Sequence, residues 1–402
     1  MIEICKVEEC TGCSTCRDVC PRHCITMVAD EMDACHPLID NDLCINCKRC
    51  INSCPNNRKL DYNYPQKVWV AWSRDTKVRL TSASGGLAYE LYRYWLSTGG
   101  VAAGVVYDHR EGCHFVLIEN LQILADIQNS KYTFSDTSGI YKVVKDKLSA
   151  DVPVLFIGVP CQIAGLYGFL KKDYANLVTI DIICHGMPPA AYLEQHISRI
   201  EKRKNEHAIK LFFRDPRFHT YTYTFTLYSP TLKLFYKKKV LGTDNYQLGY
   251  HRALIYRENC YQCRHARNER IGDLTLGDFS GLGKIAAYEG DIHNVSCVLQ
   301  NTDKGAFLLS ELGNKIYKEE RPMDEAFIYE SQLQRPSVKH PSRKVFEAEY
   351  KRTKDFERAA DASLMHDKII ALITELVCGI KNVIREILPD RIISLIRNLA
   401  AR

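Results

Sequence analysis

The chain of 402 residues has no apolar run near the roughly 18 residues that a membrane-spanning helix needs, so we expect no span. Its first ten residues, MIEICKVEEC, hold neither a basic nor an apolar segment, so we expect no signal peptide and a reducing, cytoplasmic location. The chain has little excess of either charge: 54 Lys and Arg residues against 48 Asp and Glu residues give a formal net charge of +6. This excess is too diffuse to predict nucleic-acid binding. No Ser-His-Asp set or carboxylate pair stands out, so a hydrolase is not indicated.

Cysteine, in contrast, is abundant. There are 18, and eleven of them lie between Cys5 and Cys54. A secreted disulfide scaffold is usually small and uniformly rich in cysteine, whereas here a short cysteine-rich head precedes an ordinary body. In a reducing compartment, clustered cysteines more often bind metal than pair with each other.

The head contains the motif C-x2-C-x2-C-x3-C-P twice within 60 residues. The two copies are Cys10, Cys13, Cys16, Cys20 and Pro21, and Cys44, Cys47, Cys50, Cys54 and Pro55. In this bacterial ferredoxin run, three thiolates bind one 4Fe-4S cluster and the fourth binds the other. The motif therefore predicts one cluster on Cys10, Cys13, Cys16 and Cys54 and a second on Cys44, Cys47, Cys50 and Cys20. The alternative is two four-cysteine zinc sites, which typically use separated pairs.

Three further head cysteines, Cys5, Cys24 and Cys35, are interpreted as small buried hydrophobes. After a polar segment at residues 56–67, strand and helix patterns alternate to about residue 205, which predicts an α/β domain. The expected strands are residues 68–72, 101–107, 115–119, 153–157 and 177–183, and the expected helices are residues 87–98, 138–148, 162–171 and 190–204.

The pattern changes after residue 208. Residues 221–228 alternate, with Tyr221, Tyr223, Phe225 and Leu227 on one face, and residues 232–240 are the expected hairpin partner. We interpret this as a small β insertion whose aromatic stripe packs in a core; stacking on a flat ligand is the alternative.

The C-terminal stretch is helical and basic, and residues 346–402 are predicted to form an amphipathic tail. Its apolar residues are Ile369, Ile370, Leu372, Ile373, Leu376, Val377, Ile392, Ile393, Leu395 and Ile396, with Lys381, Arg385, Arg391 and Arg397 between them. Such a tail can lie on the inner membrane surface or on a partner. The alternative is a helical hairpin packed on the body.

Four body cysteines stand in marked contexts. Cys161 and Cys184 follow two expected strands, and carboxyl ends of strands are where α/β sheets place ligands. Cys260 and Cys263 form a C-x2-C pair. Together they can hold a third 4Fe-4S cluster or one zinc ion; two separate buried cysteines plus a zinc or redox pair is the alternative.

With these motifs the chain resembles the coenzyme F-420 hydrogenase/dehydrogenase beta-subunit family, in its bacterial form with a fused dicluster ferredoxin head, over about residues 8–285. The resemblance rests on RLTSASGG from Arg79, NSKY from Asn129, FIGVPCQ from Phe156, DIICHG from Asp181, and CYQC from Cys260 followed by GDLTLGDF from Gly272. The chain departs from the family at Val159, Pro189 and Ser280, where Thr, Ser and Trp are usual. The resemblance therefore supports an expectation about the cofactor more strongly than one about the substrate.

The resemblance implies a bound FAD that exchanges electrons with the clusters, and a third 4Fe-4S cluster on Cys161, Cys184, Cys260 and Cys263. We expect FAD to be bound by Arg79, Ser82, Ser84, Gly85, Gly86, Lys131 and Gly158, with Lys131 on a phosphate or on the anionic flavin edge. His185 is expected to touch the flavin or donate a proton. A solvated lysine, a core histidine and, for Ser82–Gly86, a plain helix cap are the alternatives.

The expected fold is thus α+β. It comprises a ferredoxin-like dicluster head (1–60), a flavin-binding α/β part (68–205), a second part with the C-x2-C pair and the β insertion (206–345), and the helical tail (346–402). The expected function is an FAD and iron–sulfur oxidoreductase with a small-molecule substrate, fed by a soluble carrier such as ferredoxin. The alternatives are an electron-transfer subunit of a larger hydrogenase or dehydrogenase, and a membrane-surface redox component of polysaccharide or envelope synthesis.

Overall fold

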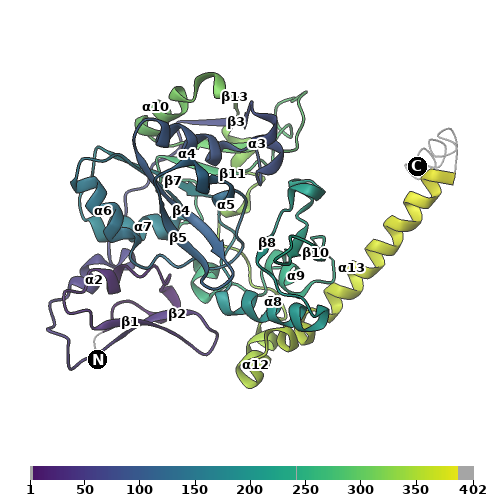
Figure 1. Ribbon diagram of the computed structural model, residues 1–402, viewed down its shortest axis with the longest axis horizontal. Helices are drawn as coiled ribbons and strands as arrows, with labels where there is room; N and C mark the ends of the chain where they lie inside the picture. The colour runs from purple at the N-terminus through teal and green to yellow at the C-terminus, as the bar shows by residue number, and fades with distance from the viewer. Residues whose placement is uncertain (1–2, 241, 388–402) are drawn as a thin grey trace.

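The computed structural model describes residues 3–240 and 242–387, with side chains described up to residue 374. The cysteine-rich head lies at one end of the body, beneath α6 and α7 (Figure 1). Its elements are α1 (Thr15–Asp18), the antiparallel strands β1 (Ile25–Ala29) and β2 (Cys35–Ile39), and α2 (Arg49–Ser53). Short 3-10 turns at Val7–Glu9 and Pro55–Asn57 flank them. The predicted ferredoxin-like head is confirmed.

The body is built on one eight-stranded sheet with the order β13-β3-β12-β11-β7-β6-β4-β5. Neighbours from β11 through β7 and β6 to β4 are parallel, and the other pairs are antiparallel. The strands are β3 (Lys67–Ser73), β4 (Val101–Asp108), β5 (Gly112–Ile118), β6 (Val154–Gly158), β7 (Leu177–Ile182), β11 (Leu274–Asp278), β12 (Ser296–Gln300) and β13 (Ile316–Arg321). The sheet thus takes strands from both predicted body segments, 68–205 and 206–345.

Helices cover both faces of this sheet, as expected for buried parallel strands. Leu155 and Ile157 of β6 face the layer of α4, α5 and α10, whereas Val154 and Phe156 face the layer of α6 and α7. The predicted strands and helices of residues 68–204 are confirmed to within two or three residues. The helices are α3 (Thr76–Thr81), α4 (Leu87–Ser97), α5 (Leu124–Ile127), α6 (Ile140–Ser149), α7 (Pro160–Leu170), α8 (Ala190–Lys204), α10 (Asp303–Glu311) and α11 (Met323–Phe327).

The predicted β insertion is present as a three-stranded antiparallel sheet, β10-β9-β8, beside α9 (Asn245–His251). Its strands are β8 (Lys210–Phe212), β9 (Phe225–Tyr228) and β10 (Leu234–Lys238). The prediction of one strand over residues 221–228 is wrong at its start, because Thr220–Thr222 forms a 3-10 turn and Tyr223 turns the chain with φ of 49°. Only Phe225 and Leu227 of the aromatic stripe enter the core.

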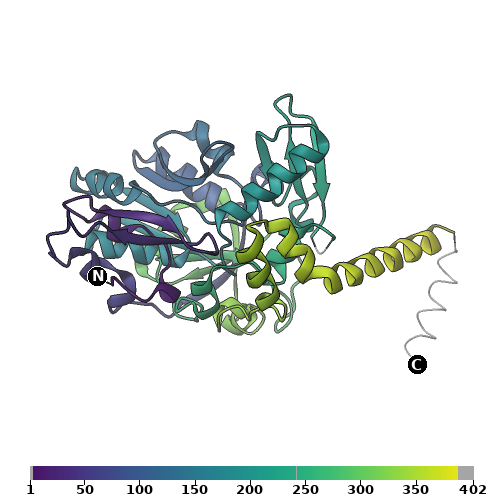
Figure 2. The same cartoon turned by 90° about the horizontal axis from the view of Figure 1, so that it is seen from below.

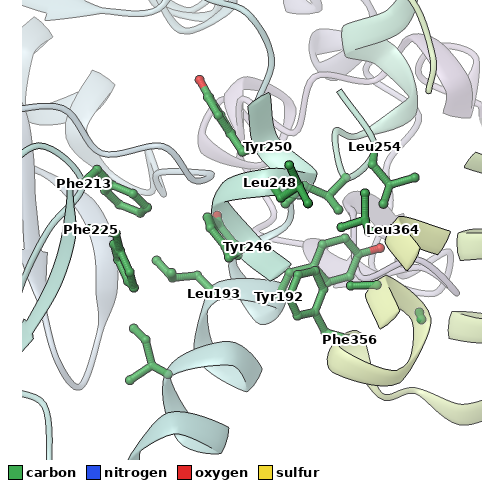
Figure 3. Close-up of a cluster of buried hydrophobic side chains, with 14 of the residues drawn as sticks. Tyr192, Leu193, Phe213, Phe225, Tyr246, Leu248, Tyr250, Leu254, Phe356 and Leu364 are labelled. Carbon is green, nitrogen blue, oxygen red and sulfur yellow. The ribbon is translucent and has the colours of Figure 1, made fainter. Parts of the chain in front are cut away.

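That core joins the insertion to α8 and to the C-terminal helices α12 (Arg343–Thr353) and α13 (Phe356–Ile387). Tyr192, Tyr246 and Phe356 meet there (Figure 3). Buried His196 ties three helices together: its Nε2 lies 3.0 Å from Asp244 Oδ2, and its Nδ1 contacts the Glu357 carboxylate.

The tail leaves the body as a long helix, α13, which projects away from the sheet in both views (Figures 1 and 2). Five apolar side chains of its described part are exposed: Met365, Ile369, Ile370, Leu372 and Ile373. The remaining predicted apolar and basic positions, from Leu376 to Arg397, lie outside the described side chains. Across the described ranges, no helix is both long and apolar enough to cross a membrane.

Candidate iron–sulfur and cofactor sites

The two copies of the cysteine motif adopt the same backbone turn. Left-handed residues precede and follow the second cysteine in each copy: Gly12 and Ser14 in the first, Asn46 and Lys48 in the second. The third cysteine then enters the first turn of α1 or α2. A turn that reverses direction twice in three residues points successive thiols toward one centre, as a cubane requires.

The structure gathers the head thiols into two groups. In the first, Cys16 lies near Cys13 and Cys10, and Cys5 lies beside both Cys10 and Cys54. Cys54, from the second copy of the motif, therefore lies close to the thiols of the first copy.

The second group lines a cavity formed by Cys20, Cys24, Cys44, Cys47 and Cys50. Cys20 Sγ lies 3.4 Å from Cys24 Sγ. Cys5 and Cys24, which the sequence marks only as buried hydrophobes, thus sit directly beside the two sites. No three described His, Cys, Asp or Glu side chains are placed to hold a single metal ion. A 4Fe-4S cluster differs from one ion in taking one thiolate on each of four irons.

The four body cysteines also come together. Burial raises the pKa of Cys184 to about 12, and the neighbouring Cys260 and Cys263 thiols add to the increase. Burial likewise raises the pKa of Cys161 well above its usual value, beside Cys184, Cys263 and Cys260. A four-thiol set in a dry site fits a metal cluster, since thiols of raised pKa ionise when a metal replaces their protons.

Helix α7 carries one of these cysteines and also the contact with the head. Cys161 lies in its first turn, and Thr15 of the head donates from Oγ1 to the Gly165 carbonyl at 2.8 Å. A Cβ on Gly168 would stand 2.2 Å from the Ser53 carbonyl oxygen, so glycine is needed for this close approach. Cys161 and Gly165 are one turn apart, about 6 Å along the helix axis. The first head site and the body thiols are therefore neighbours.

The Ser-Gly loop lies at the same edge of the sheet, between α3 and α4. Ser84 Oγ lies 2.9 Å from Ser296 Oγ, which also accepts from the Gly85 N–H at 2.9 Å. A Cβ on Gly85 would lie 2.4 Å from the Ala71 carbonyl oxygen, so this glycine has a packing reason. Ser82 is buried and donates to the Val78 carbonyl.

A cavity of about 310 Å³ adjoins this loop and is lined by Trp72, Ser73, Arg74, Thr76, Arg79, Leu80, Asp291 and Asn294. Arg79 stacks over the Trp72 ring at 4.6 Å and donates to the Asn294 carbonyl at 2.9 Å. Of the predicted flavin contacts, Arg79 lines this cavity. Gly158 lies at the end of β6, packed against Phe156, Phe115 and Gln162.

Lys131 has backbone partners rather than an open site. Its ammonium donates to the carbonyls of Asp126, Ile127, Gln128 and Asn129 at 2.6–3.2 Å, at the end of α5. Burial lowers the pKa of Lys131 to about 8. His185 is 48% exposed, and its Nε2 lies 3.9 Å from Glu330 Oε1.

A polar group faces this edge from the β insertion; the sequence patterns mark Tyr223 and Asp278 in it but not Arg214 or His251. Arg214 donates to Asp278 Oδ2 at 2.7 Å, Tyr223 donates to the same oxygen at 2.5 Å, and the Arg214 guanidinium covers the Tyr223 ring at 4.0 Å. His251 lies close by, with Nε2 buried and without a hydrogen-bond partner among the described residues. Burial, then the charges of His185 and Arg214, lower the pKa of His251 to about 4, so it is neutral at pH 7. No sequence motif links these residues, because Arg214 and Tyr223 come from the insertion whereas Asp278 ends β11.

Two segments of the chain match known protein families. The family described as the C-terminal region of the coenzyme F-420 hydrogenase/dehydrogenase beta subunit matches residues 152–326, and the 4Fe-4S dicluster domain matches residues 36–84. An uncharacterized ferredoxin of Methanocaldococcus jannaschii is 40% identical over 53 residues, which are 13% of this chain and 68% of the relative. A chain of the F-420-reducing nickel–iron hydrogenase complex from Methanosarcina barkeri aligns with 16% identity and a TM-score of 0.44, over 75% of this chain and 93% of that chain.

The family match covers the segment that holds Cys161, Cys184, Cys260 and Cys263, and the dicluster-domain match begins in the head and includes its second cysteine run. The chain thus combines a segment of the coenzyme F-420 hydrogenase/dehydrogenase beta-subunit type with a 4Fe-4S dicluster domain, the make-up of an iron–sulfur electron-transfer protein of oxidoreductase type.

Proposed function

We propose that the protein is an iron–sulfur flavoprotein oxidoreductase that receives single electrons from a soluble carrier such as ferredoxin. Its cofactors are two head clusters, a third 4Fe-4S cluster on Cys161, Cys184, Cys260 and Cys263, and FAD. The observation that carries the proposal is the position of α7 between the head and the body thiols. This helix bears Cys161, and its Gly165 and Gly168, further along, pack against the first head site. That arrangement supports a continuous path from the head into the body.

The residues that would hold FAD lie along the carboxyl edge of the sheet. The cavity beside Arg74 and Arg79 offers two cations and the Trp72 ring, which suit the phosphate and adenine end of the cofactor. Ser84 and Gly86 stand at the amino end of α4, where backbone N–H groups favour a phosphate, while Gly85 holds the loop against β12 through its N–H bond to Ser296. The cavity holds only part of so large a molecule, so the rest of FAD would extend toward the body thiols.

When bound, FAD supplies the exchange between a hydride and two single electrons. The chain contributes position and charge. Arg214 would face the electron-rich flavin ring with its charge partly balanced by Asp278, while neutral His251 and exposed His185 are the groups placed to hold or deliver a proton. The small-molecule substrate is then expected to enter between the insertion and the sheet edge.

Iron and flavin content tests this proposal. Protein purified without oxygen should contain about twelve iron atoms, four for each of three cubanes, and one FAD. Cys184→Ala should lower the iron by about four atoms while both head clusters keep their electron paramagnetic resonance signals. Cys297→Ala is the control, because Cys297 is a buried cysteine of β12 that lies apart from the other thiols. Eight irons in the wild type would exclude the third cluster, and unchanged iron in Cys184→Ala would exclude Cys184 as one of its ligands.

The exposed part of α13 supports a second proposal, that the tail places the enzyme on the inner membrane surface. Ile369, Ile370, Leu372 and Ile373 expose between 41% and 57% of their surface, and apolar side chains on one helix favour an interfacial position. Protein lacking residues 365–402 should no longer sediment with anionic lipid vesicles. Equal sedimentation of the truncated and full-length proteins would refute a membrane role for the tail.

A further inference from the structure

Arg257 is a buried cation that no carboxylate of the described residues pairs with. Only 3% of its surface is exposed, and its Nε and Nη2 atoms have no hydrogen-bond partner among the described residues. Its guanidinium lies 4.4 Å from the centre of the Phe134 ring. A buried charge that lacks a counter-charge is strongly destabilising, so proteins seldom keep one unless a bound group compensates it.

The position of this side chain identifies the group. The Arg257 backbone belongs to the body site, because its N–H donates to the Met187 carbonyl at 3.2 Å and its carbonyl accepts from the Cys260 N–H at 3.0 Å. Its guanidinium reaches the head, where Nη1 would stand 2.8 Å from a Cβ on Gly12. The glycine between Cys10 and Cys13 therefore leaves room for an arginine from the body.

Arg257 thus contacts both sites: its guanidinium lies against the loop between Cys10 and Cys13, and its backbone is hydrogen-bonded to Cys260. Each 4Fe-4S cluster held by four thiolates is an anion and gains one more negative charge when it takes up an electron. Two adjacent anionic clusters would together supply the counter-charge that Arg257 lacks.

We propose that Arg257 stands between the first head cluster and the body cluster, stabilises the reduced state of both, and so raises both reduction potentials. The body half of this inference rests on the proposed third cluster; the head half does not. Because the cluster on Cys44, Cys47, Cys50 and Cys20 belongs to the other head site, its potential should not depend on Arg257. Arg257 thus tunes the reduction potentials of the two neighbouring clusters and does not itself react.

A redox titration followed by electron paramagnetic resonance tests the proposal on the fully loaded protein. In Arg257→Gln, the first head cluster and the body cluster should each become harder to reduce by tenfold or more in the reduction equilibrium, which is 59 mV per tenfold for one electron. Arg257→Lys should keep most of the wild-type potential, since it keeps the charge. Arg358→Gln, an exposed arginine on α13, is the control and should change none of the three.

Unchanged potentials in Arg257→Gln would overturn the proposal. Equal shifts of all three clusters would also overturn it, because they would indicate a general disturbance of the protein. Iron content separates the two proposals. If the wild type holds eight irons, the third cluster is wrong, and the first head cluster alone still decides whether Arg257 sets its potential.

Discussion

Gly168→Ala tests whether the contact between α7 and the head carries electrons. The new Cβ would lie 2.2 Å from the Ser53 carbonyl oxygen, whereas ordinary contact starts at 3.4 Å, so α7 and the head must separate by about 1.2 Å. Overpacking of this kind costs about 1–3 kcal/mol, and the better helix propensity of alanine returns about 1 kcal/mol. We therefore expect a loss of up to about 2 kcal/mol in the free energy of unfolding, with all iron retained.

The functional readout is transfer from the head to the body, measured by stopped-flow after rapid reduction of the head clusters. It should slow in Gly168→Ala because the separated surfaces include the Thr15–Gly165 hydrogen bond. Gly305→Ala in α10 is a matched control: its Cβ would also lie 2.2 Å from a carbonyl oxygen, that of Asp273, away from the head. If both variants slow the transfer equally, or neither does, the reasoning about α7 is refuted.

Two further predictions concern buried charges. Burial opposes the charging of His196, but Asp244 and Glu357 outweigh it and raise its pKa to about 10 from an ordinary 6.5. The stabilisation from this group should be complete below pH 6.5 and be lost as the pH rises to about 10; denaturant unfolding at several pH values should show the loss, and His196→Gln should remove it. Asp278→Ala leaves buried Arg214 unpaired, so the free energy of unfolding should fall by about 1–3 kcal/mol and FAD should be released with the iron retained. FAD that stays bound with wild-type affinity would place the flavin elsewhere.

Local patterns predicted much of this molecule. The buried runs at 153–157 and 177–183 became β6 and β7 because a strand covered on both faces needs apolar residues at every position. The repeated cysteine run likewise fixes its own turn, since Gly12 and Asn46 occupy equivalent left-handed positions. Where the residues that determine a local structure lie within about ten positions of one another, the sequence was sufficient to predict that structure.

The rest depends on contacts across long stretches of chain. Arg257 meets Gly12 only because the head packs on α7, and nothing near either residue in the sequence indicates it. The start of β9 was misjudged for a similar reason: Tyr221 stacks on His293 at 4.1 Å, and Tyr223 turns to Asp278, so tertiary partners override the alternating pattern. Lys131 illustrates the same limit, since its motif does not reveal that four carbonyls surround the ammonium.

The unequal exposure of the two head sites has a consequence for how the protein is assembled and damaged. Thr15 and Ser53 are fully buried where the head meets α7, and Cys16 and Cys54 are nearly so, whereas Cys47 is exposed. Iron and sulfide must therefore reach the inner site before the head closes on the body, while the outer site stays open to late filling and repair. Oxygen attack should follow the reverse order and strip the outer cluster first. The damaged protein would then keep the cluster that lies against the body but lose the outer cluster, at which the proposed electron carrier would deliver its electrons.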